Sequence, residues 1–258
     1  MDWKKESEMF NQAADYYDKY RPSYPLEIID TVIKKTGIKK GSKIVEIGAG
    51  SGKATELFAG KGFHILCIEP GEDLVKIGND KFKDDTIEFK CSRFEHYDFS
   101  DQDWDVVLAA QAFHWVPQPQ GYEKCASILK SNGHLAVFWN MYITYDNELD
   151  NELIAISNKY GGFADFLSES DCETRINSIV SEIENSKLFS KPKVFRKLWE
   201  QNYTADEYFG FALTGNRFIQ KSDDEKAAAY QDIVSLSNKY NGIIKRPYLC
   251  VLYLAEKL

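Results

Sequence analysis

A short glycine-rich segment is the part of the sequence whose residue types and spacing best suit binding chemistry. Gly48, Gly50 and Gly52 follow an apolar run and precede a stretch with helical periodicity. Glycine at such a turn lets backbone N–H groups approach a ligand closely and allows positive φ. Glu69 ends the next apolar run, where a carboxylate can accept hydrogen bonds from both hydroxyls of a ribose. This combination predicts a loop that binds a nucleotide cofactor.

The spacing of the glycines separates one cofactor class from another. A dinucleotide loop has the pattern G-x-G-x-x-G, but Lys53 stands where the third glycine would be if the pattern began at Gly48. The sequence also argues against a phosphate-binding P-loop. That loop has a glycine, four spacer residues and then Gly-Lys-Ser/Thr, and this pattern is absent. The spacing therefore disfavours an NAD-dependent oxidoreductase, which stays a weaker alternative.

Charge and cysteine usage restrict the partners of the chain. The net charge of −8 disfavours nucleic acid, because phosphate binding normally needs a basic surface. The charged N-terminus lacks the apolar stretch of a signal peptide, and the longest apolar run near the end is too short to span a bilayer. The five scattered cysteines are typical of a reduced protein. We expect a cytoplasmic location, no membrane or nucleic-acid partner, and no metal.

The elements that must position these residues follow from hydrophobic periodicity. Short apolar runs alternate with amphipathic stretches, which favours right-handed crossovers and a parallel sheet. The expected strands are 43–47, 63–69, 86–91, 104–110 and 133–139, and the expected helices between them are 53–59, 72–82 and 121–130.

Two further regions flank this core. An aromatic segment, 10–25, leads into a helix with Pro25 near its start and Gly37 just past its end. After the core we expect a largely helical stretch, a strand at 193–203, a helix opened by Thr204, a helix at 223–240 and a last strand at 248–255 that pairs antiparallel with the sheet. The prediction is one domain over 1–258, with an N-terminal lid and first helix (1–40), a cofactor-binding core (41–140), a helical lid insertion (141–190) and a part that completes the sheet (191–258).

Four segments together carry a family resemblance: VEIGAGSGKAT, IEPGEDL, DVVLAAQAFHWV and LKSNGHLAVFWN. In this order they resemble the motifs of class I S-adenosylmethionine-dependent methyltransferases. The stretch from Tyr16 to Pro25 and the triplet at 113–115 are similar to the small-molecule branch that includes trans-aconitate methyltransferases. The resemblance covers roughly residues 10–140. It implies an α/β fold with a Rossmann-like, seven-stranded, mostly parallel sheet, an antiparallel last strand, helices on both faces and a helical lid.

The resemblance also implies which residues bind the cofactor S-adenosyl-L-methionine and its product S-adenosyl-L-homocysteine. The loop would contact the methionine and ribose, Glu69 the ribose hydroxyls, the residues after it and after the third strand the adenine, and the end of the fourth strand the methionine. Many relatives have an aspartate where Ser92 or Arg93 stands, so a side-chain contact to the adenine is in question. The predicted cofactor-binding residues are Arg21, Glu46, Gly48, Ala49, Gly50, Gly52, Glu69, Pro70, Ser92, Arg93, Phe94, Ala110 and Gln111.

Two of the candidate positions keep a structural alternative. Arg21 could pair with the methionine carboxylate or an acidic substrate, or be a surface arginine before a proline turn. His114 is the candidate catalytic base because its ordinary pKa is near neutrality, or it is a packing residue. A carboxylate acceptor would need no base.

Aromatic residues near these positions are candidates for the acceptor site. The predicted substrate-binding residues are Tyr20, Phe113, His114, Trp115 and Trp139, although a stripe of core aromatics explains the rings about equally well. The motif of amino-methylating DNA enzymes is missing after the fourth strand. We therefore expect methyl transfer to a small-molecule carboxylate, hydroxyl or amine by a monomer or homodimer. The alternative is an inactive, cofactor-binding regulatory protein.

Overall fold

The computed structural model describes residues 14–83, 85–100, 103–215 and 217–258, so residues 1–13 of the predicted N-terminal lid lie outside the described part. The elements in chain order are α2 (Ala14–Tyr20), α3 (Leu26–Thr36), β1 (Lys43–Ile47), α4 (Thr55–Phe58), β2 (His64–Glu69), α5 (Glu72–Lys81), β3 (Ile87–Cys91), η1 (Phe94–His96), β4 (Trp104–Ala110), η2 (Phe113–Trp115), α6 (Gln120–Ile128), β5 (Leu129–Ile143), α7 (Glu148–Lys159), β6 (Phe166–Leu167), α8 (Glu169–Asn185), β7 (Lys193–Tyr203), α9 (Ala205–Ala212), α10 (Asp223–Lys239) and β8 (Ile244–Glu256).

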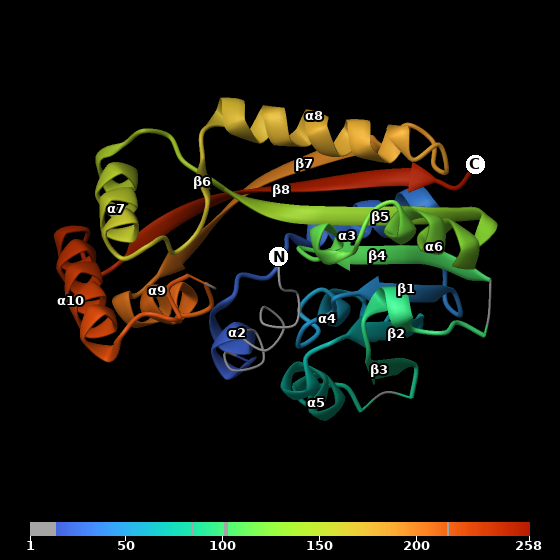
Figure 1. Ribbon diagram of the computed structural model, residues 1–258, viewed down its shortest axis with the longest axis horizontal. Coiled ribbons are helices and arrows are strands. Elements are labelled where there is room, and N and C mark those ends of the chain that lie inside the picture. The colour runs from blue at the N-terminus through green and yellow to red at the C-terminus, as the bar shows by residue number, and fades with distance from the viewer. Residues whose placement is uncertain (1–13, 84, 101–102, 216) are drawn as a thin grey trace. The chain divides into compact units, whose positions relative to one another are not determined.

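A mixed sheet organises the chain, with the strand order β3-β2-β1-β4-β5-β8-β7 and β6 paired to β5 (Figure 1). Strands β1 to β5 are mutually parallel wherever they pair. The last strand, β8, runs antiparallel between β5 and β7 (Figure 1). The predicted Rossmann-like sheet is therefore confirmed. It has one strand more than predicted, because the two residues of β6 are too few to give a sequence pattern.

The centre of the sheet is buried on both faces. Val106, Val107, Leu108 and Ala109 of β4 are fully buried, as expected for a continuously apolar strand of a parallel sheet. The predicted ends of α3 are also confirmed: Pro25 occupies the N-cap, and Gly37 follows the helix in the left-handed region with φ of 70°. Among the described residues, no helix is both long and apolar enough to cross a membrane.

Several element boundaries differ from the sequence prediction, and two of these differences have a clear physical cause. Helix α4 covers only Thr55–Phe58, because the chain turns through Gly50 and Gly52 with positive φ before it can become helical. Strand β5 begins at Leu129, inside the predicted helix 121–130. Leu129 is buried and pairs with Trp104 of β4, so pairing with the sheet overrides the local helical pattern.

The contacts divide the chain into two compact units. Within the described residues, unit 1 comprises 14–22, Met141–Thr174 and Leu198–Leu249; unit 2 comprises Ser23–Asn140, Arg175–Lys197 and Cys250–Leu258. Strands β5, β7 and β8 each contain a boundary between the units. The core of unit 1 is rich in aromatic rings, and its buried members include Tyr160, Phe163, Tyr203, Tyr208, Phe211, Phe218 and Tyr248.

Candidate functional site

The glycine loop in unit 2 follows β1 and has the backbone that the sequence predicts. Gly48, Gly50 and Gly52 have φ values of 61°, 58° and 85°. A Cβ atom on Gly48 would lie 2.5 Å from the Cβ of Ala112, and one on Gly52 would lie 2.4 Å from the ring of Phe82. These positions therefore need glycine both for conformation and for close approach. The contact with Ala112 brings the loop against the turn after β4.

The carboxylate of Glu69 is built into this loop. One carboxylate oxygen, Oε2, accepts a hydrogen bond from the backbone N–H of Gly50 at 2.9 Å, and the other, Oε1, accepts one from Gly71 at 2.9 Å. Burial raises the pKa of Glu69, and the two backbone N–H groups act against that rise. Each carboxylate oxygen has a second lone pair. Glu69 can therefore hold the loop and still accept hydrogen bonds from a ligand.

The segment after β3 lies beside Glu69. The backbone N–H of Ser92 donates to the carbonyl of Glu69 at 3.0 Å, and the Ser92 hydroxyl donates to the carbonyl of Arg93. The guanidinium of Arg93 forms an ion pair with the carboxylate of Glu95, with Nη1 and Oε1 3.7 Å apart. Phe94 is buried, whereas Pro70 is exposed. A backbone hydrogen bond thus joins the segment after β3 to Glu69.

Beneath the loop lies a second buried carboxyl, Glu46, with a partner that the sequence did not indicate. The hydroxyl of Thr55 donates to Oε2 of Glu46 at 2.7 Å. Burial raises the pKa of Glu46 to about 8; the Thr55 hydrogen bond lowers it, and the charge of Glu69 raises it further. The adjacent Ser51 hydroxyl is buried with no hydrogen-bond partner among the described residues. The only sequence signal for Thr55 and Ser51 is their polarity next to the glycines.

The turn after β4 is held in an uncommon conformation. Gln111 has a φ of 57°, and non-glycine residues in this region cost about 1 kcal/mol or more. Its backbone N–H donates to the backbone carbonyl of Phe138, and its side-chain amide donates to the backbone carbonyl of Asn140 at 3.2 Å. The Asn140 side chain is itself buried and donates to the carbonyl of Ser23. Ala110, the other residue predicted for the methionine end, is buried just before this turn.

His114 is hydrogen-bonded to another predicted residue. The indole N–H of Trp139 donates to Nδ1 of His114 at 3.2 Å. Desolvation lowers the pKa of His114 to about 4, and the positive charge of Arg175 lowers it as well. His114 is exposed, and its lowered pKa leaves the imidazole neutral at neutral pH.

The other predicted aromatic residues of unit 2 differ in exposure. Phe113 is buried, with its ring centroid 5.0 Å from that of Tyr122. Trp115 is only half-buried, with its ring centroid 4.7 Å from that of His114. Trp115 and His114 are therefore the more accessible members of the triplet.

Tyr20 and Arg21 belong to unit 1. Tyr20 packs directly on Gly210 of α9, where a Cβ atom would lie 2.3 Å from its ring. Arg21 donates from Nη1 to the Tyr142 hydroxyl at 2.7 Å and from Nη2 to the Thr214 carbonyl at 3.0 Å.

The environment of Arg21 is aromatic. Its guanidinium carbon is 5.5 Å from the ring centroids of both Tyr17 and Phe211. Its Nε atom is buried without a partner, and no carboxylate pairs with it among the described residues. The surface alternative for Arg21 therefore does not hold for its guanidinium, which lies inside an aromatic shell with unused hydrogen-bonding capacity.

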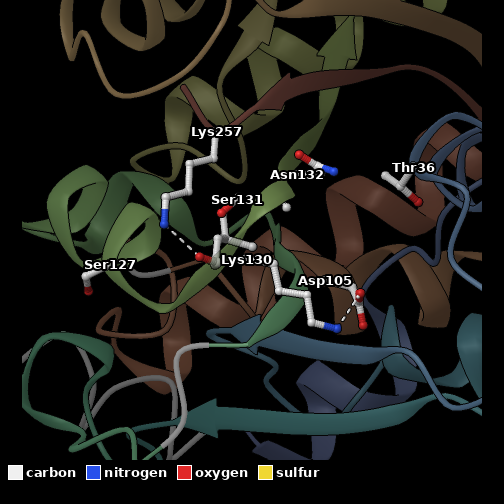
Figure 2. Close-up of a pocket in the computed structure, with 9 residues that line it drawn as sticks. Thr36, Asp105, Ser127, Lys130, Ser131, Asn132 and Lys257 are labelled. Atoms are coloured by element: carbon white, nitrogen blue, oxygen red, sulfur yellow. Dashed lines mark hydrogen bonds and ion pairs between the residues drawn. The ribbon is translucent and has the colours of Figure 1, made fainter.

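A polar pocket lies elsewhere in unit 2, at the amino-terminal edge of the parallel strands (Figure 2). Lys130 points toward Asp105, with Nζ and Oδ1 2.8 Å apart, and Lys257 donates to the carbonyl of Leu129 at 2.7 Å. None of the predicted site residues lines this pocket. The carboxyl-terminal edge, where the loop and Glu69 lie, is thus the candidate site.

Comparison with known proteins shows similarity to methyltransferases over part of the chain. Residues 45–137 match the family model described as a methyltransferase domain. An uncharacterized methyltransferase of Mycobacterium tuberculosis is 28% identical over 131 residues, which are 51% of this chain and 51% of that protein. A probable S-adenosylmethionine-dependent methyltransferase of Saccharomyces cerevisiae is 29% identical over 166 residues, 62% of this chain and 55% of that protein. The matches span about half the length of these curated relatives.

Solved structures resemble the fold over most of the chain. A candidate methyltransferase from an antibiotic biosynthesis pathway of Anabaena variabilis has a TM-score of 0.62 at 16% identity, over 91% of this chain and 98% of that one. The [4+2]-cyclase SpnF has a TM-score of 0.52 at 13% identity, over 92% and 84%. Together, the domain match and the relatives show that about half of the chain is similar to methyltransferases. The structural neighbours show the fold alone, and the trans-aconitate-like branch stays a prediction from the sequence.

Proposed function

We propose that the chain binds S-adenosylmethionine at the glycine loop and transfers its methyl group to a small-molecule carboxylate, hydroxyl or amine by in-line displacement. The observation that carries this proposal is the buried Glu69 carboxylate, fixed between the N–H groups of Gly50 and Gly71 beside a loop of positive-φ glycines. The buried Ser51 hydroxyl of the same loop has no hydrogen-bond partner among the described residues, which fits a site where a ligand makes further polar contacts. The bound cofactor would supply the reactive methyl sulfonium. The chain then needs only to position the acceptor against the methyl group and to exclude water from both.

The residues of unit 2 divide by the part of the cofactor that each would hold. The backbone of Gly48, Ala49, Gly50 and Gly52, with Glu46 beneath it, would contact the methionine and ribose. Glu69 would accept the ribose hydroxyls. Pro70 and the segment from Ser92 to Phe94 would flank the adenine, and Ala110 and Gln111 would meet the methionine.

The acceptor would meet the exposed residues after β4. His114 and Trp115 are the accessible candidates, while Phe113 and Trp139 would shape the site from buried positions. Tyr20 is the predicted acceptor contact of unit 1. Arg21, whose guanidinium has unused hydrogen-bonding capacity, is the residue suited to an anionic group, either the methionine carboxylate or an acidic acceptor. The cytoplasmic location and the monomeric or homodimeric state stay predictions from the sequence.

Ligand titration tests the cofactor assignment. We expect S-adenosylmethionine and S-adenosylhomocysteine to raise the melting temperature of the protein, since a ligand that binds only the folded state stabilises it. NAD should have no effect. Stabilisation by NAD but not by S-adenosylmethionine would contradict the proposal.

Replacing Glu69 tests the ribose contact. Glu69→Ala should weaken S-adenosylhomocysteine binding by about 1.5–3 kcal/mol through lost charge-assisted hydrogen bonds, measured by calorimetry. Glu72→Ala, which removes an exposed carboxylate three residues further on, is the matched control and should bind normally. Equal affinity of the Glu69 variant and the wild type would remove the ribose role from Glu69.

Turnover separates an enzyme from a regulatory cofactor-binding protein. The fold also occurs in a cyclase, so cofactor binding alone does not establish methyl transfer. We expect S-adenosylhomocysteine to accumulate with at least one member of a panel of carboxylates, alcohols and amines. Cofactor binding without turnover across that panel would favour the regulatory alternative.

A further inference from the structure

The hydrogen bond between Trp139 and His114 determines which imidazole nitrogen carries the proton. An indole N–H has no lone pair to offer and can only donate. Nδ1 of His114, 3.2 Å from the Trp139 nitrogen, must therefore be the acceptor and unprotonated. A neutral imidazole with an unprotonated Nδ1 has its proton on Nε2.

Both partners of this bond lie on supported elements. Trp139 is in β5, is 6% exposed, and stacks edge-on against Tyr253 with ring centroids 5.7 Å apart. His114 is in η2, whose first residue, Phe113, is buried. A buried indole N–H without a partner would cost about 1–3 kcal/mol, which favours keeping the bond. The tautomer is thus a consequence of packing around Trp139.

The surroundings of His114 also oppose a charged imidazole. Arg175 is the charged group whose field acts on His114, and it disfavours a second positive charge. No carboxylate hydrogen-bonds or pairs with His114 among the described residues. Nε2 has no hydrogen-bond partner in that part of the chain either, although His114 is exposed. The exposed residue therefore has an N–H donor available.

We propose that Trp139 is a positioning residue which, through its hydrogen bond to Nδ1, holds His114 as a neutral donor whose Nε2–H binds an oxygen of the methyl acceptor. The identity of the ligand rests on the proposed function, whereas the tautomer does not. In this role His114 does not take up the acceptor's proton, because Nδ1 is engaged and Nε2 already carries hydrogen.

The donor role selects among the three acceptor classes. An acceptor oxygen has more than one lone pair, so it can accept from Nε2–H and still attack the methyl carbon. A neutral amine has a single lone pair, which the same hydrogen bond would occupy. An ammonium has none. His114 therefore favours an oxygen acceptor over an amine. A carboxylate attacks the methyl carbon with no proton to lose, whereas a hydroxyl would have to release its proton to solvent.

Nuclear magnetic resonance of the full chain tests the tautomer without any substrate. With ¹⁵N-labelled protein, His114 should show the Nε2–H tautomer at neutral pH, and a scalar coupling should connect the Trp139 indole nitrogen with Nδ1 across the hydrogen bond. An Nδ1–H tautomer, or no coupling, would overturn the proposal. This measurement uses wild-type protein, so it does not depend on whether a variant folds.

Substitution tests whether Trp139 is the cause. Trp139→Phe should remove the scalar coupling and weaken the preference for the Nε2–H tautomer, because no indole N–H then donates to Nδ1. Trp104→Phe is the matched control, because Trp104 is a tryptophan of the same sheet whose buried indole N–H has no partner among the described residues. It should leave the His114 signals unchanged. An unaltered His114 in Trp139→Phe would refute the positioning role.

Kinetics with the acceptor found in the panel tests the contact to oxygen. His114→Gln keeps an N–H donor and should retain most of kcat, whereas His114→Leu should lower kcat about 10-fold or more. The wild-type kcat/KM should not fall with the protonation of a histidine as the pH is lowered through neutrality. A histidine that acted as general base would produce such a fall. An acceptor panel that yields only amines would overturn the oxygen contact. Absence of all turnover would contradict the proposed function, and with it that contact, while the tautomer result would stand.

Discussion

The glycine loop of unit 2 and the surroundings of Arg21 in unit 1 are built in different ways. The loop uses backbone atoms from one short stretch, and Glu69 is the side chain whose carboxylate it binds. The guanidinium of Arg21 is enclosed by side chains and a carbonyl from distant parts of the chain, among them Tyr142, Phe211 and Thr214. A site made from backbone is encoded locally and suits the part of a reaction that relatives share. A site made from distant side chains can change one residue at a time, which suits recognition of a particular acceptor.

A second arginine of unit 1, the buried Arg246, sharpens this comparison, and the largest expected effect is at that residue. Arg246 pairs with the buried carboxylate of Asp150, whereas Arg21 has no carboxylate among the described residues. Arg246→Met should destabilise the protein by about 3–5 kcal/mol in urea unfolding, because it leaves Asp150 buried and unpaired. Arg21→Met is the matched variant and should change stability by only about 1 kcal/mol, since it also removes the cost of burying a charge.

Binding measurements on the same pair give the complementary result. Arg21→Met should weaken the binding of the cofactor or of an anionic acceptor, although the variant protein is nearly as stable as the wild type. If Arg21→Met unfolds as readily as Arg246→Met, Arg21 is a structural residue and the contrast between the two regions fails.

The next largest effect is expected in the loop. Gly48→Ala combines a left-handed backbone with a Cβ only 2.5 Å from that of Ala112, so S-adenosylhomocysteine binding should weaken about 100-fold. Gly60→Ala is the control, because its φ of 72° imposes the same conformational penalty with no atom within 4 Å of the added Cβ. It should cost about 1 kcal/mol of stability and leave calorimetric affinity unchanged. Equal loss of affinity in both variants would attribute the effect to general strain.

The last expected effect is a pH dependence that belongs to unit 2. Glu46 has a pKa of about 8 in the folded protein and an ordinary carboxyl pKa when unfolded. Between these values the unfolded state binds fewer protons than the folded state, so stability falls as pH rises. In the Glu46→Gln variant, the loss of unfolding free energy between about pH 5.5 and 7.5 should therefore be smaller by roughly 2–3 kcal/mol. Glu123→Gln, at an exposed site, should keep the wild-type slope, and a wild-type slope in Glu46→Gln would refute the raised pKa.

The same division explains what could be predicted from the sequence. The strands around Gly48 and Glu69 were predictable because apolar periodicity and glycine spacing are local signals. The start of β5 at Leu129 was not, because pairing with Trp104 decides it. The hydrogen bonds of Thr55 to Glu46 and of Trp139 to His114 join residues whose proximity depends on the folded sheet. The aromatic surroundings of Arg21 lay furthest from prediction, since Tyr142 and Phe211 are more than a hundred residues away in sequence.

The passage of β5, β7 and β8 through both units has a consequence for how the protein could diversify. Unit 1 is assembled from three separate stretches of chain, and these strands cross the boundary without an intervening linker. No single insertion, deletion or gene fusion could exchange unit 1 as a cassette. Grafting its properties onto a relative would require three coordinated transplants with the strands kept in register. Gradual substitution of side chains is therefore the more accessible route by which this architecture acquires a new specificity.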